Sequence, residues 1–175
     1  MNIHKLIGRL SLGGLLFSLT FSVFAGNSVQ INLRGNLLGS RPCDIAASDG
    51  KNTISVNFGD MVIRYITGNN FGQPVPYKIT CPPGSDTTIV LSFSGTTVPG
   101  QADALATNNK DLGIRFQYSL GGTSNFARLN TKFVTFDSKN QLPVITAYPR
   151  IYNSNLSAVK TGTFTSTITL RADYP

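Results

Sequence analysis

The sequence contains no tryptophan and no glutamate, and its single histidine is His4. All eight acidic residues are therefore aspartates, and they are dispersed along the chain. Without His4, which lies in an N-terminal leader, the chain can assemble neither histidine-based general acid–base catalysis nor a Ser-His-Asp triad. Two aspartates can meet in space as they do in glycosidases, but aspartates in loops usually form turns and caps. The sequence therefore predicts that the protein is not an enzyme and uses no small-molecule substrate and no cofactor.

The leader is a short basic head followed by an apolar run. Lys5 and Arg9 precede an apolar stretch over residues 10–24, and Ala25 is a small residue of the kind that signal peptidase reads. A membrane anchor is the alternative, but a spanning helix needs about 20 mostly apolar residues. This stretch is shorter and is interrupted by Ser, Thr and Gly. The pattern predicts a signal peptide over residues 1–25 that is cleaved on export.

Basic residues outnumber acidic ones, with 15 Lys and Arg against 8 Asp and a formal net charge of +7. Lys5 and Arg9 leave with the leader, and the remaining basic residues are scattered singly among Thr, Ser and Asn. A basic surface can favour nucleic acid, but the chain carries no binding motif and is expected to be exported. We therefore expect a solvated, mildly basic surface and no nucleic-acid partner.

The chain has only two cysteines, Cys43 and Cys81, which are 38 residues apart. In an exported protein, an even pair of cysteines is expected to form a disulfide. A redox-active pair would be close in sequence, and a zinc site would need further ligands. We predict a structural disulfide and no metal site. Closing this loop in the unfolded chain is expected to stabilise the fold by about 3–4 kcal/mol.

Short stretches with apolar residues at alternate positions follow the first cysteine and are separated by turn-forming residues. They cover residues 53–58, 75–81, 88–95, 112–120, 127–136 and 142–152. Residues 67–74, 82–86 and 100–111 have the composition of turns and loops. Pro143 and Pro149 suit an edge or a bend of the last of these strands. No stretch shows a convincing helical period, so the pattern predicts one all-β domain, an antiparallel β-sandwich.

The final alternating stretch is the longest and covers residues 162–175. One face carries Gly162, Phe164, Ser166, Ile168, Leu170, Ala172 and Tyr174, and the other carries threonines, Arg171 and Asp173. No later strand follows that would cover its far side. We therefore expect this strand to have one edge without a partner from its own chain.

An alternating stretch also precedes the first cysteine, over residues 28–39, with no turn that folds it back on a neighbour. Its apolar positions are Val29, Ile31, Leu33 and Leu37, with Gly35 at the same parity. An unpaired apolar strand edge is an aggregation hazard that proteins rarely leave open. If the front strand of one chain fills the gap beside the last strand of another, both strands are paired. This arrangement is β-strand addition between chains.

Taken in order along the chain, these features resemble the pilin subunits of chaperone–usher fimbriae. The elements are the signal peptide, the extension with "RGNLLGSRPC", the cysteine pair, the "DLGIRF" strand, Gly162 at the fourteenth position from the end and the penultimate Tyr174. The extension is most similar to those of minor, tip-proximal subunits of P-type and type 1-like pili. The sequence over residues 59–77 differs from that of major pilins. The resemblance therefore assigns no residues to lateral contacts between subunits.

The resemblance implies an incomplete immunoglobulin-like antiparallel β-sandwich. It divides the exported chain into a donor-strand extension over residues 26–39 and a pilin domain over residues 40–175 that lacks its final strand. A periplasmic chaperone would lend the missing strand beside residues 163–174 and bind the Pro175 carboxylate with basic residues. At the outer-membrane usher, the extension of the next subunit would then replace the chaperone strand.

The resemblance also implies the residues of each strand. The donor residues are Val29, Ile31, Leu33, Gly35 and Leu37, where the glycine allows close approach of the backbones. The acceptor and chaperone-contacting residues are Gly162, Phe164, Ile168, Leu170, Tyr174 and Pro175. The expected partners are the chaperone, the usher, neighbouring pilin subunits and a tip adhesin. The expected location is a cell-surface fimbrium that supports adhesion and is reached through the periplasm.

Beside a minor or adaptor pilin, two alternatives stay open and a third is disfavoured. The first is the major subunit of the fimbrial rod. The second is a secreted β-sandwich binding protein in which residues 28–38 fold back onto the last strand of the same chain. The third, the sugar-binding adhesin itself, is disfavoured because the exported chain has room for one domain and carries an extension. A stable monomer would distinguish the self-complemented sandwich from both pilins.

Overall fold

The structure is a computed structural model that describes Arg34 and residues 43–84 and 86–175. The predicted signal peptide over residues 1–25 lies outside the described residues. The predicted donor residues Val29, Ile31, Leu33, Gly35 and Leu37 and the boundary between residues 39 and 40 lie outside them as well.

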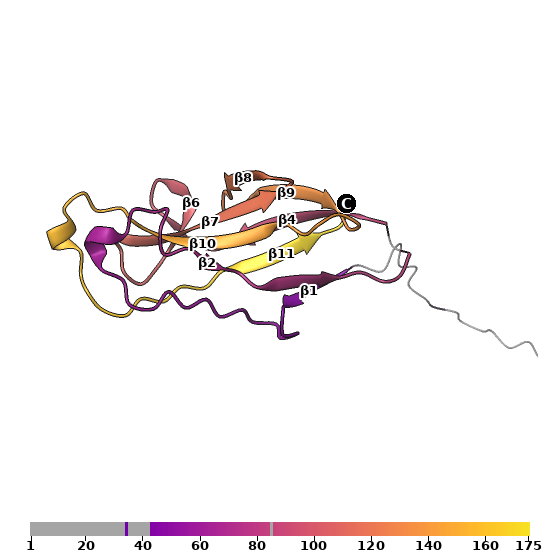
Figure 1. Ribbon diagram of the computed structural model, residues 1–175, viewed down its shortest axis with the longest axis horizontal. Helices are drawn as coiled ribbons and strands as arrows, with labels where there is room; N and C mark the ends of the chain where they lie inside the picture. The colour runs from indigo at the N-terminus through magenta and orange to yellow at the C-terminus, as the bar shows by residue number, and fades with distance from the viewer. Residues whose placement is uncertain (1–33, 35–42, 85) are drawn as a thin grey trace, which may run out of the picture. The chain divides into compact units, whose positions relative to one another are not determined.

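The described residues form antiparallel strands and two short 3-10 helices (Figure 1). The strands are β1 (Asp44–Ala47), β2 (Gln73–Pro74), β3 (Tyr77–Thr80), β4 (Thr88–Ser94), β5 (Thr97–Val98), β6 (Gln101–Ala106), β7 (Leu112–Leu120), β8 (Thr123–Phe126), β9 (Lys132–Asp137), β10 (Val144–Ile151) and β11 (Thr169–Asp173). The helices are η1 (Ile63–Tyr65) and η2 (Leu156–Ala158). The prediction of an all-β domain is confirmed.

The strands are arranged in two main sheets and one separate pair. The larger sheet has the order β2-β10-β7-β6-β5, with β8 added to β7, and the smaller sheet has the order β11-β4-β9. Strands β1 and β3 pair with each other. Strand β11 is at the edge of its sheet, so one of its edges faces no strand of the described part of the chain.

Apolar side chains from the inner faces of both sheets form the core. Phe93 of β4 is 1% exposed, and its ring lies 4.5 Å from the ring of Phe116 in β7 and 4.9 Å from that of Phe133 in β9. Ile89 and Leu91 of β4 and Ile145 of β10 are also buried. Because apolar residues at alternate positions meet between the sheets, the architecture is a β-sandwich.

Strand β6 lies where the sequence predicted a loop over residues 100–111. Ala102, Ala104 and Ala106 give this segment little intrinsic preference for a strand. In the structure, however, Ala104 is buried, and β6 pairs with β7. Burial and pairing with a neighbour therefore outweigh local propensity, and the loop prediction is wrong for residues 101–106.

Two other predicted strands have different bounds in the structure. The predicted strand over residues 75–81 is reduced to β3, after the separate two-residue β2. The predicted strand over residues 127–136 is reduced to β9, and residues 127–131 connect β9 to the preceding β8. Turn chemistry decides these boundaries, as Asn130 illustrates with its φ of 58°, a conformation that asparagine adopts more readily than most residues.

Pro149 lies inside β10, with β7 on one side and, on the other, only the isolated bridge between Thr67 and Arg150 beyond the end of β2. It is opposite Ile114 of β7, and the Tyr152 N–H donates to the Asp111 carbonyl in the same ladder. Hydrogen-bonded pairs alternate along an antiparallel ladder, so the nitrogen of Pro149 faces away from β7. On that side, β2 pairs with only two residues of β10, both before Pro149. The missing N–H therefore removes no bond from either ladder.

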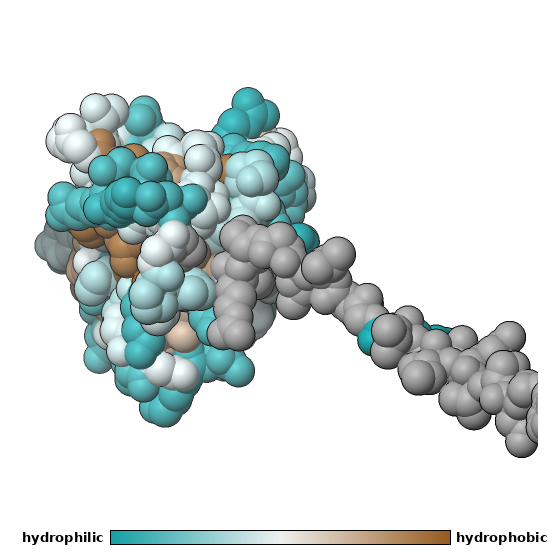
Figure 2. Space-filling view, turned by 90° about the vertical axis from the view of Figure 1, so that its right-hand side faces the viewer, coloured by the Kyte–Doolittle hydropathy of each residue, from teal (hydrophilic) through white to brown (hydrophobic). Residues whose placement is uncertain are grey.

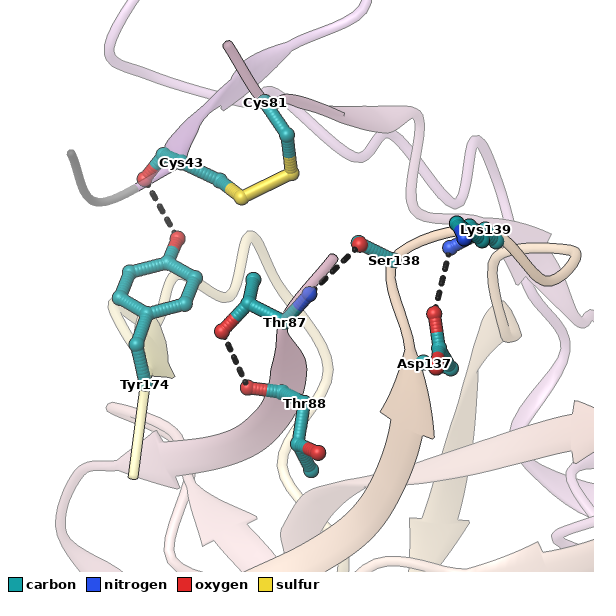
Figure 3. Close-up of a disulfide and its surroundings, with 8 residues drawn as sticks. All are labelled: Cys43, Cys81, Thr87, Thr88, Asp137, Ser138, Lys139 and Tyr174. Atoms are coloured by element: carbon teal, nitrogen blue, oxygen red, sulfur yellow. Dashed lines mark hydrogen bonds between the residues drawn. A yellow bond between two sulfur atoms is a disulfide. The ribbon is translucent and has the colours of Figure 1, made fainter. Parts of the chain in front are cut away.

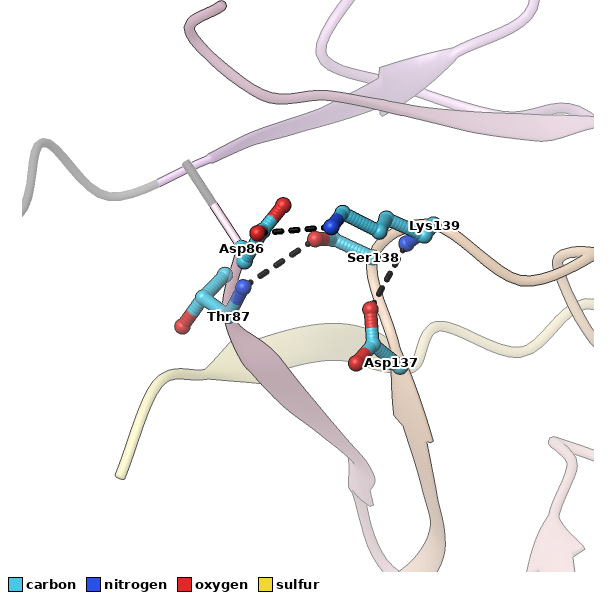
Figure 4. A network of polar contacts seen from close by, with 5 residues as sticks. All are labelled: Asp86, Thr87, Asp137, Ser138 and Lys139. Atoms are coloured by element: carbon cyan, nitrogen blue, oxygen red, sulfur yellow. Dashed lines mark hydrogen bonds and ion pairs between the residues drawn. The ribbon is translucent and has the colours of Figure 1, made fainter. Parts of the chain in front are cut away.

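The ends of β4 and β9 are joined by a polar network (Figure 4). The Ser138 N–H donates to the Thr87 carbonyl at 2.9 Å, and the Thr87 N–H donates to Ser138 Oγ at 3.2 Å. Lys139 Nζ lies 2.6 Å from Asp86 Oδ2, where both side chains are largely exposed. Exposed ion pairs contribute little, so the backbone bonds are the main connection between these strand ends.

Gly113 is the glycine of the "DLGIRF" stretch and lies in β7, where there is no room for a side chain. A Cβ at this position would lie 2.7 Å from Val98 Cγ2, 2.9 Å from Tyr152 Cε2 and 3.2 Å from the Leu105 carbonyl oxygen. Gly113 therefore allows close packing of β7 against its neighbours.

We predict that Gly113→Ala lowers the free energy of unfolding by about 1–3 kcal/mol, because the added methyl group overpacks this site. Urea unfolding, carried out on both proteins in the same bound state, measures the change. The exposed Ser124→Ala in β8 is the control and is expected to stay within about 0.5 kcal/mol of the wild type. A Gly113→Ala protein as stable as the wild type would show that the site has free space.

Within residues 43–84 and 86–175, no helix has the length and apolar character needed to cross a membrane. In the same part of the chain, no three His, Cys, Asp or Glu residues come close enough together to hold a metal ion.

Candidate functional site

The described domain has a groove of about 1120 Å³ with an apolar floor. Two extended segments, residues 52–60 and residues 160–170, form its walls. The floor is made by Phe93, Leu105, Ile114, Phe116, Ala147 and Ile151, which come from both sheets. Figure 2 looks onto the end of the domain at the right of Figure 1 and shows apolar residues recessed between hydrophilic ones. The groove therefore reaches from the surface to buried residues of the sandwich core.

The first wall contains residues 53–58, which the sequence predicted as a strand. Ile54, Val56 and Phe58 are half-buried and alternate with exposed polar residues, as in a strand with one face on a core. Among the described residues, however, this segment pairs with no strand. Its backbone N–H and C=O groups are therefore available to a strand from elsewhere.

The second wall precedes β11 and continues into it. Phe164, Ile168 and Leu170 are half-buried, and the threonines between them are exposed, as predicted for this strand. Only the final part, β11, is in a ladder, where it pairs with β4. Gly162 has a φ of 131°, a conformation that other residues rarely adopt, and it lies where the chain turns into the wall.

The two walls touch through one aromatic contact. The rings of Phe58 and Phe164 lie 5.9 Å apart and are tilted by 39°. Under the second wall, Ile168 lies close to Gly95, where a Cβ would be 3.3 Å from Ile168 Cγ1. Asn130 holds Gly95 through two hydrogen bonds, with its Oδ1 accepting from the Gly95 N–H and its Nδ2 donating to the Gly95 carbonyl. The support beneath the wall is therefore fixed by side-chain hydrogen bonds.

One end of the domain is fixed by the disulfide between Cys43 and Cys81, as predicted (Figure 3). The disulfide links the start of β1 to the residue that follows β3. The Tyr174 hydroxyl donates to the Cys43 carbonyl, which ties the end of the last strand to the same point (Figure 3). The first strand, the last strand and the end of β3 are therefore held together here.

The structure brings together four of the six predicted acceptor residues. Gly162, Phe164, Ile168 and Leu170 line the groove. Tyr174 does not line it and contacts Cys43, and Pro175 is exposed. The role of all six in accepting a strand stays a prediction.

Sequence reasoning missed the opposite wall and the floor as parts of the site. Residues 53–58 have the same alternation as any half-buried strand, so nothing in the pattern distinguishes a paired strand from an unpaired one. The floor residues have the sequence pattern of ordinary core residues, and five of the six are buried in the structure.

Three tyrosines around the domain keep their protons to unusually high pH. Burial raises the pKa of Tyr77 well above its usual value, and its hydroxyl donates to the Pro143 carbonyl at 2.6 Å. Burial also raises the pKa of Tyr152, as does the nearby Asp103. For Tyr174, burial is again the main cause of a raised pKa, followed by Asp44 and Asp173.

We therefore predict that the free energy of unfolding falls as the pH rises above about 10. In the unfolded chain tyrosine loses its proton near pH 10, whereas the folded chain still holds it, so the unfolded state binds fewer protons. The stabilisation that these tyrosines give to the folded state is fully present below about pH 10 and is lost above it. Urea unfolding between pH 8 and 11 measures this slope. Tyr77→Phe is expected to reduce the slope. An equal slope in the Tyr77→Phe protein would contradict the assignment.

The fold and the groove define a class of protein, an antiparallel β-sandwich with an open edge beside its last strand. A family model described as "Fimbrial protein" matches residues 31–175. The chain therefore belongs to the fimbrial protein family, and the resemblance to pilin subunits is confirmed.

Two Escherichia coli K12 proteins and two solved structures illustrate the similarity. The fimbrial-like protein YfcR is 30% identical over 159 residues, which cover 89% of this chain and 86% of YfcR. The fimbrial-like protein YfcQ is 29% identical over 149 residues, which cover 83% and 86%. The P pilus adaptor subunit PapF matches with a TM-score of 0.54 and 25% identity over 78% of this chain and 98% of PapF. The P pilus rod subunit PapA matches with a TM-score of 0.54 and 21% identity over 85% and 100%. The sandwich is thus the immunoglobulin-like fold of pilin subunits, as predicted.

Proposed function

We propose that the chain is a structural subunit of a chaperone–usher fimbria and that its groove takes up a β-strand from another protein. The observation that carries the proposal is the pair of extended walls, residues 53–58 and residues 163–168, which face an apolar floor without a strand between them. A strand inserted there would pair with backbone groups of the walls and cover their half-buried apolar side chains.

The extension of this chain has the pattern that such a groove in a neighbouring subunit requires. Val29, Ile31, Leu33 and Leu37 have the parity of one strand face. Burying four such side chains contributes roughly 6–12 kcal/mol before the cost of ordering the strand. A joint of this kind dissociates slowly, which suits a fibre under mechanical load.

The partners of this process are a periplasmic chaperone, an outer-membrane usher, neighbouring pilin subunits and, at the end of the fibre, a tip adhesin. The chaperone strand would occupy the groove first, and the extension of the next subunit would replace it by donor-strand exchange. The protein would thus pass through the periplasm to a cell-surface fimbrium and support adhesion.

Within the fimbria, we propose a minor or adaptor position. The amino-acid sequence of the extension and the 25% identity to the adaptor PapF support this position. The rod subunit is the second candidate, supported by the equal TM-score of PapA. Counting the subunit in purified fimbriae tests the choice, because an adaptor is present in few copies and a rod subunit in most positions.

Isolation of the full chain from the periplasm of its host tests the proposed function. A tag is inserted in the turn at Gly121 and Gly122, which are exposed between β7 and β8, and the mass of the intact complex is measured. We expect a one-to-one complex with a second periplasmic protein. A stable monomer that melts cooperatively without a partner would mean that the sandwich closes on itself, and the proposal would be wrong.

A further inference from the structure

The second wall of the groove is held in place by the turn between β6 and β7, although residues 160–168 belong to no strand. Asn108 in this turn binds Thr165 at two points. The Asn108 N–H donates to the Thr165 carbonyl at 3.1 Å, and the Thr165 N–H donates to Asn108 Oδ1 at 2.9 Å. Asn108 is exposed, so its side chain fills no space in the core.

Two further contacts join the wall to this turn and to the last residue of β6. Asn109 Nδ2 donates to the Lys160 carbonyl at 2.9 Å, and Ser166 Oγ donates to the Ala106 carbonyl. The wall is therefore anchored at residues 160, 165 and 166, on both sides of Phe164.

The turn itself is well braced. Thr107 Oγ1 donates to the Leu112 carbonyl at 2.9 Å and accepts from the Asn109 N–H at 3.1 Å. Asn109 Oδ1 accepts from the Asp111 N–H at 3.1 Å. Asn108 therefore projects from a turn whose backbone is fixed by its own side chains.

The Asn108 contact decides which edge of the wall stays free. In an extended chain, the N–H and C=O of one residue point to the same side, and those of the next residue point to the opposite side. Both polar groups of Thr165 are bound to Asn108. In a regular strand, the backbone groups of Phe164 and Ser166 then point to the other edge, away from the turn.

The opposite wall has no comparable anchor. For residues 52–60, the hydrogen bonds within the described part of the chain reduce to a local one, in which the Gly59 N–H donates to Asn57 Oδ1 at 2.8 Å. The second wall is therefore the better-defined template for a pairing strand.

We infer that Asn108 is a positioning residue for strand uptake: by occupying both backbone groups of Thr165, it presents the opposite edge of the wall to the incoming strand. The inference rests on the proposed function and adds to it the device that prepares one wall for pairing. The occupant of the groove remains the extension of a neighbouring subunit.

Exchange kinetics test the inference. The full chain is purified as its complex with the periplasmic chaperone, and a fluorescent peptide with the sequence of residues 28–38 is added to follow its uptake by anisotropy. Asn108→Ala, which lacks the Oδ1 acceptor, is expected to take up the peptide about fivefold more slowly, as the loss of one net hydrogen bond implies. Asn108→Asp retains the acceptor and is expected to stay near the wild-type rate. Asn140→Ala, an exposed asparagine in the turn after β9, is the matched control and is expected to be unchanged.

Amide hydrogen exchange in the peptide-filled subunit is a second readout. It distinguishes a local effect at Thr165 from a general loss of stability, which would lower protection across the whole domain. In the wild type, the amides of Phe164, Thr165 and Ser166 are all expected to be protected, the first and third by the peptide and Thr165 by Asn108. In Asn108→Ala, Thr165 alone is expected to lose protection. This readout also applies if the variant accumulates poorly, because only filled subunits are measured.

The outcomes separate the inference from the proposed function. A wild-type complex that takes up no peptide would overturn the proposed function. A wild type that takes up the peptide, with Asn108→Ala at the same rate and Thr165 still protected, would overturn only the inference. A uniform loss of protection across the domain in Asn108→Ala would also overturn it, because the residue would then act on global stability.

Discussion

Replacing Ile168 by aspartate is expected to reduce uptake of a donor strand by the groove at least about a hundredfold. Ile168 is half-buried in the second wall and lines the groove beside Leu170. A strand seated over this position would bury the carboxylate without a partner, at a cost of several kcal/mol, and about 2.8 kcal/mol already corresponds to a hundredfold change in affinity. Peptide uptake by the chaperone complex and the amount of assembled fimbriae on cells measure the effect.

Thr167→Asp is the matched control for this prediction. Thr167 is the adjacent residue on the exposed face of the same wall, so the variant adds the same charge one position away without placing it under the donor strand. We expect uptake and assembly close to those of the wild type. If Ile168→Asp assembles as well as Thr167→Asp, the groove is not where subunits join.

Replacing both Cys43 and Cys81 by serine is expected to lower the free energy of unfolding by about 3–4 kcal/mol, because the unfolded chain regains the freedom of a 38-residue loop. The bond also lies where the Tyr174 hydroxyl meets the Cys43 carbonyl, so its loss loosens the first and last strands together. Urea unfolding of the peptide-filled subunit measures the change.

Reduction of the wild-type disulfide serves as the control for the double substitution. The reduced wild type and the double serine variant are expected to unfold at the same urea concentration, both well below the oxidised protein. A double variant as stable as the oxidised protein would show that hydrogen bonds and packing alone hold β1, β3 and β11 together. Tyr174→Phe separates the two contributions, because it removes the hydrogen bond and keeps the disulfide.

The proposed mechanism separates two properties of the last strand. Residues 169–173 are paired with β4 and belong to the folded sheet, whereas residues 163–168 are extended and without a ladder. Side chains of the turn between β6 and β7 hold the second part in place of a neighbouring strand. The wall is thus ordered before a partner strand arrives, which reduces the conformational entropy that pairing costs.

The sequence by itself determined the class of this domain, because the relevant signals are local. Period-two alternation bounded by Gly and Pro is a property of short stretches and predicted an all-β sandwich. An even pair of cysteines in an exported chain predicted the disulfide between Cys43 and Cys81. The alternation over residues 162–175 predicted the half-buried positions of Phe164, Ile168, Leu170, Ala172 and Tyr174, whereas Gly162 and Ser166 of the same face are exposed.

Only the tertiary structure decided which strands have neighbours, because pairing depends on residues far apart in sequence. Residues 101–106 became a strand through β7 despite their alanines, and Pro149 fitted β10 because its nitrogen faces past the end of β2. Residues 53–58 read as an ordinary strand, but the described domain offers them no partner. The contact of Asn108 with Thr165 also has no sequence signal, because an exposed asparagine in a turn is common. The groove exists because the two walls have no strand between them. The alternation of apolar residues does not reveal this, because it is a local property and pairing is not.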